Sequence, residues 1–316
     1  MKRNRVSVIL FLIIIISVIG YSAYEMVNQR KDEDYISVSV IVNDSSNVRW
    51  DAFRTGLEQG AEDNHVHLNL VSTGTFQGAQ EEHAIVKREL DGDADGVIVD
   101  PYSSEKDIIL PTESAKPVVL IETGIETDKL FNSVMTDHVK LGKSLADAVI
   151  KDKAVKVGIL SGNQEQLGMR QRLKSVQDAL AEAGIEISWI LSEKEFNKKM
   201  RSMEYFADHQ TDTVISLENN STEKAVDILL NDDSISWKLY GEGRSEKLIY
   251  YLDKGLIQEL AVPNEYYMGY ESMVLAAQSI RYYTDKTEQA DVEFYMISKE
   301  NLYDEETSRI LFPNVR

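Results

Sequence analysis

The spacing of apolar residues from Tyr35 onward predicts an α/β protein. Short apolar runs of strand length alternate with amphipathic segments of helix length, which is typical of parallel sheets joined by right-handed crossovers. The expected strands are 36–42, 67–72, 96–101, 117–123, 132–136, 155–161, 186–191, 213–217, 237–241, 256–262 and 292–298. The expected helices are 50–61, 77–90, 139–151, 168–183, 193–209, 222–230, 246–252 and 268–283.

The segment 131–151 divides this alternation into two similar halves. It begins as a strand and continues as a helix, and Asp137 stands between them. An aspartate there is a good N-cap, because its side chain accepts a hydrogen bond from an otherwise unpaired backbone N–H. The alternation that precedes this segment starts again after it. We therefore expect two Rossmann-like lobes that meet near Asp137 and leave a cleft between them.

The first 34 residues predict a destination outside the cytoplasm. Residues 1–5 carry three positive charges, and an almost wholly apolar run, 6–20, extends weakly to Val27. A basic start followed by such a run is typical of a signal peptide or of a signal anchor, and about 20 apolar residues span a bilayer as a helix. We expect an uncleaved anchor followed by a polar linker, 28–34. Cleavage near Ala23 would instead give a secreted protein.

The composition argues against several classes of function. A formal net charge of −19 disfavours nucleic-acid binding, which needs a basic surface. The chain has no cysteine and therefore no disulfide or thiolate metal site. The histidines form no metal-ligand pattern, and the calcium-loop-like segment 91–96 lacks its glutamate, since Tyr102 stands at that position. No catalytic motif is recognisable. We expect no enzymatic activity, no metal and no other cofactor.

A series of short motifs follows in a characteristic order and spacing from about Tyr35 to about Tyr303. They are Trp50 with Gly56, Gln80, 94–101, 116–119, Asp137 with Gly142, Gly162 with Arg170, Gly241 with Gly255, Asn264, 268–270 and 298–301. In these motifs the chain resembles the type I periplasmic binding proteins, in particular the sugar-binding branch that includes ribose- and galactose-binding proteins. The resemblance implies two lobes with parallel sheets and three passages of the chain between them.

The resemblance also implies where each lobe begins and ends. The passages would lie near Asp137, Pro263 and Ala290, which would act as the hinge. Lobe 1 would then comprise residues 35–136 with 264–290, and lobe 2 residues 137–263 with 291–316. The anchor and linker, 1–34, would precede both.

The family binds its ligand at the carboxyl ends of the strands, as open α/β sheets generally do. The resemblance implies a ligand-binding site made of Asn43, Asn47, Arg49, Trp50, Glu122, Arg170, Glu218, Asn219 and Arg244. Trp50 retains one member of an aromatic pair whose flat face suits a sugar ring. Arg170 matches the ligand-binding arginine of the family, whose planar fork suits a hydroxyl pair or a carboxylate.

Several of these positions depart from the sugar-binding pattern. The departures are Arg49 in place of an aromatic residue, Glu122-Thr123 in place of Asp-Arg, Glu218-Asn219 in place of Asn-Asp, Gly243 beside Arg244 in place of Asp, and Pro263 in place of Gln. A monosaccharide pocket with these changes loses several hydrogen bonds. We therefore expect another polyol, an acidic or amino sugar, or a different small polar molecule rather than a simple hexose or pentose.

Three functions remain open from the sequence. The first is a receptor that closes around a small polar, sugar-like ligand and delivers it to the membrane permease of an ABC importer. The second is a ligand-sensing subunit that signals to a membrane sensor kinase. The third is a degenerate binding fold that serves as a protein-interaction module. An uncleaved anchor and an incomplete sugar pocket favour the second and third, whereas the family as a whole favours the first.

Overall fold

The computed structural model describes residues 15–21, 35–105, 115–199, 204–282 and 287–311. Ser37–Arg316 form one compact unit. Of the predicted anchor, 6–27, residues 15–21 are helical, and the others lie outside the described residues. Within the described ranges, no helix has both the length and the apolar character needed to cross a bilayer.

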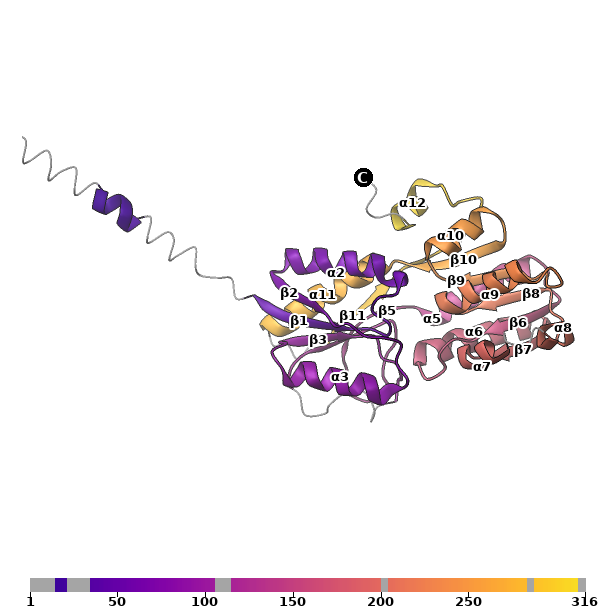
Figure 1. Ribbon diagram of the computed structural model, residues 1–316, viewed down its shortest axis with the longest axis horizontal. Coiled ribbons are helices and arrows are strands. Elements are labelled where there is room, and N and C mark those ends of the chain that lie inside the picture. The colour runs from indigo at the N-terminus through magenta and orange to yellow at the C-terminus, as the bar shows by residue number, and fades with distance from the viewer. Residues whose placement is uncertain (1–14, 22–34, 106–114, 200–203, 283–286, 312–316) are drawn as a thin grey trace, which may run out of the picture. The chain divides into compact units, whose positions relative to one another are not determined.

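The first sheet, with the helices that cover it, is called lobe 1. Its strands lie in the order β11-β5-β4-β3-β1-β2. They are β1 (Ile36–Ile41), β2 (Val66–Leu70), β3 (Gly96–Val99), β4 (Val118–Ile121), β5 (Asn132–Thr136) and β11 (Gln289–Val292). The strands from β11 to β1 are parallel. The helices α2 (Asp51–Asp63) and α11 (Glu265–Tyr282) lie on one side of this sheet and α3 (Ala79–Asp91) on the other (Figure 1).

The second sheet and its helices form lobe 2, with the strand order β12-β10-β9-β8-β6-β7. The strands are β6 (Lys156–Leu160), β7 (Glu186–Leu191), β8 (Thr213–Ser216), β9 (Lys238–Glu242), β10 (Ile257–Pro263) and β12 (Phe294–Ser298), of which β12 alone pairs antiparallel, with β10. The helices are α5 (His138–Lys151), α6 (Leu167–Glu182), α7 (Glu193–Lys199), α8 (Glu204–Asp208), α9 (Asn219–Asn231), α10 (Glu246–Asp253) and α12 (Glu305–Leu311). One core lies between the sheet and α5 with α6, and a second lies against α9 and α10.

Two glycines allow α2 and α11 to pack backbone against backbone. A Cβ atom at Gly56 would clash with the carbonyl oxygen of Tyr266, and one at Gly269 would clash with the carbonyl oxygen of Phe53. The two helices can therefore approach this closely only because both positions are glycine and carry no side chain. It fixes α11 against α2, and a short 3-10 turn, Val48–Trp50, leads into α2 from the loop that carries Asn47.

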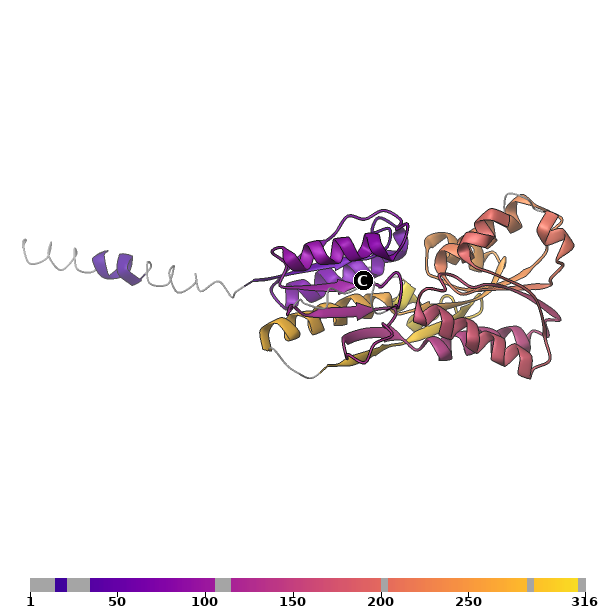
Figure 2. The same cartoon turned by 90° about the horizontal axis from the view of Figure 1, so that it is seen from below.

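The described elements pass between the lobes after β5, after β10 and between β11 and β12 (Figures 1 and 2). The first passage contains Asp137, whose side chain accepts a hydrogen bond from the N–H of Lys140 at 2.9 Å, as predicted for an N-cap. The third passage lies at Glu293, later than the expected Ala290, because β11 stays paired with β5 as far as Val292.

Two other elements differ from the sequence-based expectation. The short edge strand β11 was not predicted, because only one side of an edge strand pairs and its sequence, QADV, lacks an apolar alternation. The expected strand 292–298 accordingly begins at Phe294. The single helix expected over 193–209 is described as α7 and α8, and residues 200–203 lie outside the described residues.

Candidate functional site

A cavity of about 840 Å³ lies between the two lobes. Its walls include residues that directly follow β1, β3 and β4 in lobe 1 and β6, β7 and β8 in lobe 2. These are the carboxyl ends of the strands, where parallel sheets generally bind ligands. The volume falls within the range of about 300 to 1,000 Å³ that is usual for small-molecule sites.

The structure brings six of the nine predicted site residues to this cavity. Those that line it are Asn43, Asn47, Arg49, Trp50, Glu122 and Glu218. The other three, Arg170, Asn219 and Arg244, are not among the lining residues, because each is held by other contacts.

Arg49 covers the aromatic face that was expected to receive a sugar ring. Its guanidinium carbon lies 4.0 Å from the centroid of the Trp50 ring, and Trp50 is only 1% exposed. The indole Nε1–H donates a hydrogen bond to the carbonyl oxygen of Asn43 at 3.1 Å, so the ring is held at its edge and covered on one face. The cavity therefore presents a stacked guanidinium at this position, and Tyr102 lines another part of the wall.

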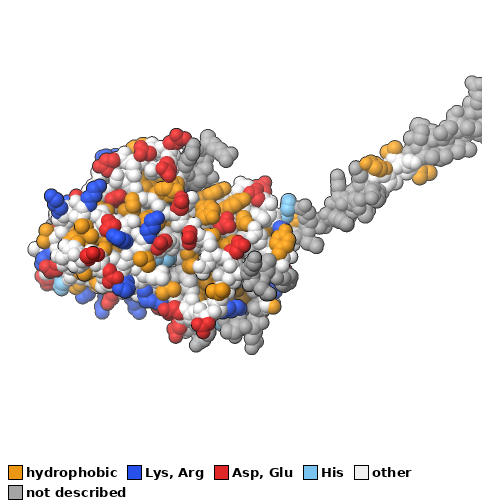
Figure 3. All heavy atoms as spheres, turned by 180° about the vertical axis from the view of Figure 1, so that it is seen from behind, with side chains coloured by type: hydrophobic (Ala, Val, Ile, Leu, Met, Phe, Trp, Pro, Cys, Tyr) orange, Lys and Arg blue, Asp and Glu red, His pale blue; other side chains and the backbone are white. Residues whose placement is uncertain are grey.

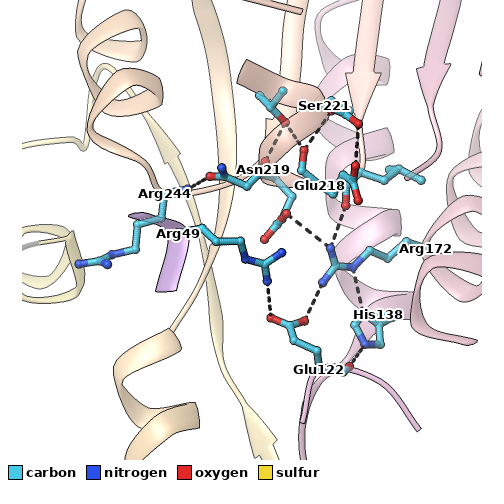
Figure 4. A network of polar contacts seen from close by, with 12 residues as sticks. Arg49, Glu122, His138, Arg172, Glu218, Asn219, Ser221 and Arg244 are labelled. Carbon is cyan, nitrogen blue, oxygen red and sulfur yellow. Dashed lines mark hydrogen bonds and ion pairs between the residues drawn. The ribbon is translucent and has the colours of Figure 1, made fainter. Parts of the chain in front are cut away.

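Glu122 stands between two arginines at the bottom of the cleft (Figure 4). Its carboxylate oxygens lie 3.6 Å from Nη2 of Arg49 in lobe 1 and 3.5 Å from Nη2 of Arg172 in lobe 2. These are ion pairs, but the distances are too long for hydrogen bonds. The backbone of Glu122 has a φ of 59°, a left-handed conformation that is uncommon for a residue with a side chain and that clusters at functional sites.

Arg49, Glu122, Arg172 and Glu242 form a network of ion pairs. Arg172 connects this network to His138, in the first passage between the lobes. The side chain is 1% exposed and lies 3.6 Å from the carboxylate of Glu242. Its Nη1 donates to the carbonyl oxygen of Leu217 at 2.8 Å, and its Nε donates to Nδ1 of His138 at 2.9 Å. Since Nδ1 of His138 accepts, Nε2 carries the proton and donates to the carbonyl oxygen of Glu122. Burial, together with the charge of Arg172, lowers the pKa of His138 to about 4, so the imidazole is neutral.

Several carboxyl groups around this network are buried. Burial raises the pKa of Asp100 to about 7, with a further contribution from Glu122. Burial likewise raises the pKa of Glu242 to about 7 and that of Glu265 to about 8, and the nearby arginines offset only part of the effect. The floor of the cleft therefore contains more carboxyl groups than its arginines can neutralise.

The three predicted residues that do not line the cavity have structural partners. Arg170 lies 2.9 Å from the carboxylate of Glu126 and donates to two carbonyl oxygens of its own lobe. The side-chain oxygen of Asn219 accepts the N–H of Arg244 at 3.0 Å and shapes the loop after β9. Nη2 of Arg244 donates to the carbonyl oxygen of Leu311 in α12 at 2.7 Å.

Side chains that line the cavity also join the two lobes directly. Nδ2 of Asn47 donates to Oδ1 of Asn220 at 3.4 Å. Nδ2 of Asn163 donates to the carbonyl oxygen of Tyr102 at 2.7 Å, and Nε2 of Gln166 donates to that of Pro101 at 2.8 Å. The lobes are thus in contact beside the cavity.

Four residues in or beneath the cavity were not predicted from the sequence: Asp100, Arg172, Glu242 and Glu265. Asp100 and Glu242 stand at the carboxyl ends of β3 and β9, so the rule that ligands bind at strand ends would have selected them. The sequence offered no comparable signal for Arg172, which lies in the middle of an amphipathic helix beside two other basic residues, Arg170 and Lys174.

Residues 38–282 match a family described as periplasmic binding protein domain. No curated protein sequence gives a significant match. Similar solved structures include the myo-inositol binding protein of Caulobacter bound to myo-inositol, with 19% identity over 88% of this chain and 97% of that chain and a TM-score of 0.74.

Two further structures share the fold. One is a glucose-galactose binding protein from Geobacillus stearothermophilus, with 21% identity over 86% of this chain and 100% of that chain and a TM-score of 0.71. The other is an ABC transporter solute binding protein from Agrobacterium vitis with bound D-fucose, with 14% identity over 87% of this chain and 100% of that chain and a TM-score of 0.77. These similarities confirm the expected α/β fold with two lobes of mostly parallel strands.

Proposed function

Since the chain belongs to the periplasmic binding protein domain family, we propose that it binds a small polar, sugar-like solute between its lobes and delivers it to the membrane permease of an ABC importer. The observation that carries this proposal is the 840 Å³ cavity at the carboxyl ends of strands from both sheets. The three similar structures described above support it, since their descriptions name inositol, glucose and galactose, or fucose.

Closure of the lobes around the solute is the second part of the proposal. The cavity wall comes from both lobes, so a solute contacts both sides only while they are together and must bind that form more tightly. The three passages at 136–138, 262–264 and 290–293 supply the hinge. Small-angle scattering of the full chain in detergent with a saturating solute is expected to give a smaller radius of gyration than without it. Equal radii, with binding shown independently, would favour a rigid interaction module.

A thermal-shift panel of monosaccharides, amino sugars and cyclitols tests the binding itself. A solute that binds only the folded chain stabilises it by about 2.7 kcal/mol at a concentration one hundred times its dissociation constant. For a protein of this size, we expect the melting temperature to rise by several degrees. A panel that leaves the melting temperature of the folded chain unchanged would refute the proposal.

The family places the binding domain outside the cytoplasm. We propose that residues 6–27 remain as an uncleaved anchor. Fractionation of the expressed full chain should then place it with the membranes, with Met1 as its first residue. A soluble form that begins near Ala23 would contradict the anchor. The sensor-kinase alternative differs from the transport proposal in its membrane partner, and the same binding panel applies to both.

A further inference from the structure

Asp100 is a buried carboxylate without an ion-pair partner in the described part of the chain. It follows β3, lines the cavity and is 6% exposed. Its Oδ1 accepts a hydrogen bond from Nε2 of Gln166 at 3.2 Å, but Oδ2 receives none from any described residue. An ionised carboxylate that is buried without a partner is costly, so it either keeps a proton or is neutralised by a cation.

The neighbouring cations are already engaged by other acidic groups. Arg49 stacks on Trp50 and pairs with Glu122, and Arg172 lies between Glu122 and Glu242. Over the whole cavity wall, acidic side chains outnumber basic ones by seven to three. The raised pKa of Asp100, about 7, has the same cause, since burial and Glu122 outweigh the two arginines. Asp100 therefore faces the cavity as an uncompensated acid.

We infer that the solute carries a protonated amine and that Asp100 binds this ammonium group. An ammonium supplies three hydrogen-bond donors and a positive charge, which are the two things that Asp100 lacks. The amide groups of the wall, among them Asn43, Asn47 and Gln164, suit the hydroxyl groups of the same molecule. The solute class is thus an amine-bearing polyol, such as an amino sugar or an aminocyclitol.

The charge of the whole chain agrees with a cationic solute. A net charge of −19 attracts a cation towards the cleft and raises its rate of association. This inference rests on the proposed function, because it takes the cavity to be the solute site. It names the charge of the solute, which the binding proposal leaves open.

Matched sets of sugars test the inference by isothermal titration calorimetry with the full chain in mild detergent. Each set contains an amino sugar, its neutral parent and its N-acetyl derivative, for example glucosamine, glucose and N-acetylglucosamine, and an aminocyclitol is compared with myo-inositol. We expect at least one amine to bind about tenfold more tightly than both neutral relatives, because only the amine brings a positive charge to its hydrogen bond with the carboxylate of Asp100.

The variant Asp100→Asn separates the charge of this side chain from its shape. It keeps an acceptor for Gln166 but removes the negative charge, so the tenfold preference for the amine over its neutral relatives should disappear. The matched control is Asp147→Asn, an exposed aspartate of α5 that pairs with Lys143 at 2.9 Å. We expect that control to leave both affinities unchanged.

The outcomes distinguish this inference from the proposed function. Neutral sugars that bind as tightly as the amines, or more tightly, would overturn the inference and leave the proposed function intact. An amine preference that persists in Asp100→Asn would also overturn it, because another group would then hold the ammonium. If no member of the panel binds to the folded chain, the inference and the proposed function fail together.

Discussion

Charged residues on the exposed helices and beneath the cleft are arranged differently. On the surface, Lys174 lies 2.6 Å from Asp178 and Lys143 lies 2.9 Å from Asp147, each one helical turn apart and more than half exposed. Figure 3 shows one such face, on which acidic and basic side chains are interspersed. Beneath the cleft, the ion pairs of Arg172 span 3.5 to 3.6 Å, although this side chain is 1% exposed.

The difference shows where polar groups remain free to bind a solute. The surface pairs satisfy each other at hydrogen-bond distance, and exposed pairs of this kind contribute only about 0 to 1 kcal/mol to stability. Among the described residues beneath the cleft, Nε of Arg49, Nη2 of Arg172 and Oε2 of Glu265 are buried without a hydrogen-bond partner. Such incompletely satisfied groups are usually avoided in a core, so their concentration here marks a place where function overrides stability.

Removing Arg172 should produce the largest effect. Arg172→Met would leave the carboxylate of Glu242 buried without its ion-pair partner and Glu122 with Arg49 alone, and breaking a buried pair from one side costs about 3 to 5 kcal/mol. Urea unfolding should therefore shift to a much lower midpoint. The control lies two residues along the same helix: Lys174→Met should change the free energy of unfolding by less than about 0.5 kcal/mol. Similar losses in both variants would erase the distinction between the two regions.

The pH dependence of stability should show an effect of similar size. Four buried carboxyl groups have pKa values in the folded chain that exceed those in the unfolded chain: about 7 for Asp100 and Glu242, and about 8 for Glu265 and Glu82. The folded chain therefore binds more protons than the unfolded chain and loses stability as pH rises. His138 has the opposite effect, because its pKa of about 4 in the folded chain is below the unfolded value of 6.5. Its effect on the pH dependence of stability ends above pH 6.5, where it is neutral in both states. Between pH 6.5 and 8.5 only these four carboxyl groups still titrate, and their raised pKa values correspond to a loss of roughly 5 kcal/mol without solute.

Urea midpoints measured across this pH range test the expectation. Glu265→Gln cannot titrate and should flatten the curve, whereas the exposed Asp147→Asn should leave it unchanged. Stability that rises between pH 6.5 and 8.5 would mean that the buried carboxyl groups are ionised and well compensated, as the surface pairs are.

The fold was more predictable than the site, for a physical reason. Strands of a covered sheet are apolar along their length, so runs such as Val97 to Val99 are visible in the sequence, and the polar residues that follow them mark the cleft. Side-chain partners depend on helix rotation instead. Arg170 and Arg172 are two positions apart and so differ by about 200° around α6. Arg170 reaches the exposed Glu126, and Arg172 reaches the buried network. The order of motifs along the chain pointed to Arg170 as the site residue and gave no sign of Arg172.

Truncation of Arg49 should have a moderate effect on binding. Arg49→Ala removes a guanidinium that lines the cavity and uncovers the face of Trp50. We expect the affinity for the solute to fall by about 1 to 3 kcal/mol. Arg49→Lys keeps the charge but loses the planar stack, so a loss of similar size would show that the stack matters rather than the charge. Unchanged affinity in both variants would move the binding site away from Arg49.

The smallest effect is expected at Arg170, whose ion pair is exposed like those on the surface but joins the two lobes. Its partner Glu126 lies in the loop after β4 of lobe 1, and the two side chains are 36% and 57% exposed. Because the pair exists only while the lobes are in contact, it stabilises the closed form relative to the open one, by about 0 to 1 kcal/mol for an exposed pair.

Arg170→Ala should therefore weaken the binding of every solute by the same factor, at most about fivefold, because it shifts the equilibrium between open and closed forms and not a contact with the solute. Glu126→Gln should cause a similar loss, and the double variant should lose no more than Arg170→Ala alone, since all three variants remove the same ion pair. Titrations with two chemically different solutes provide the measurement. A loss above tenfold, or one that depends on the solute, would place the guanidinium of Arg170 on the ligand, as the family resemblance implies.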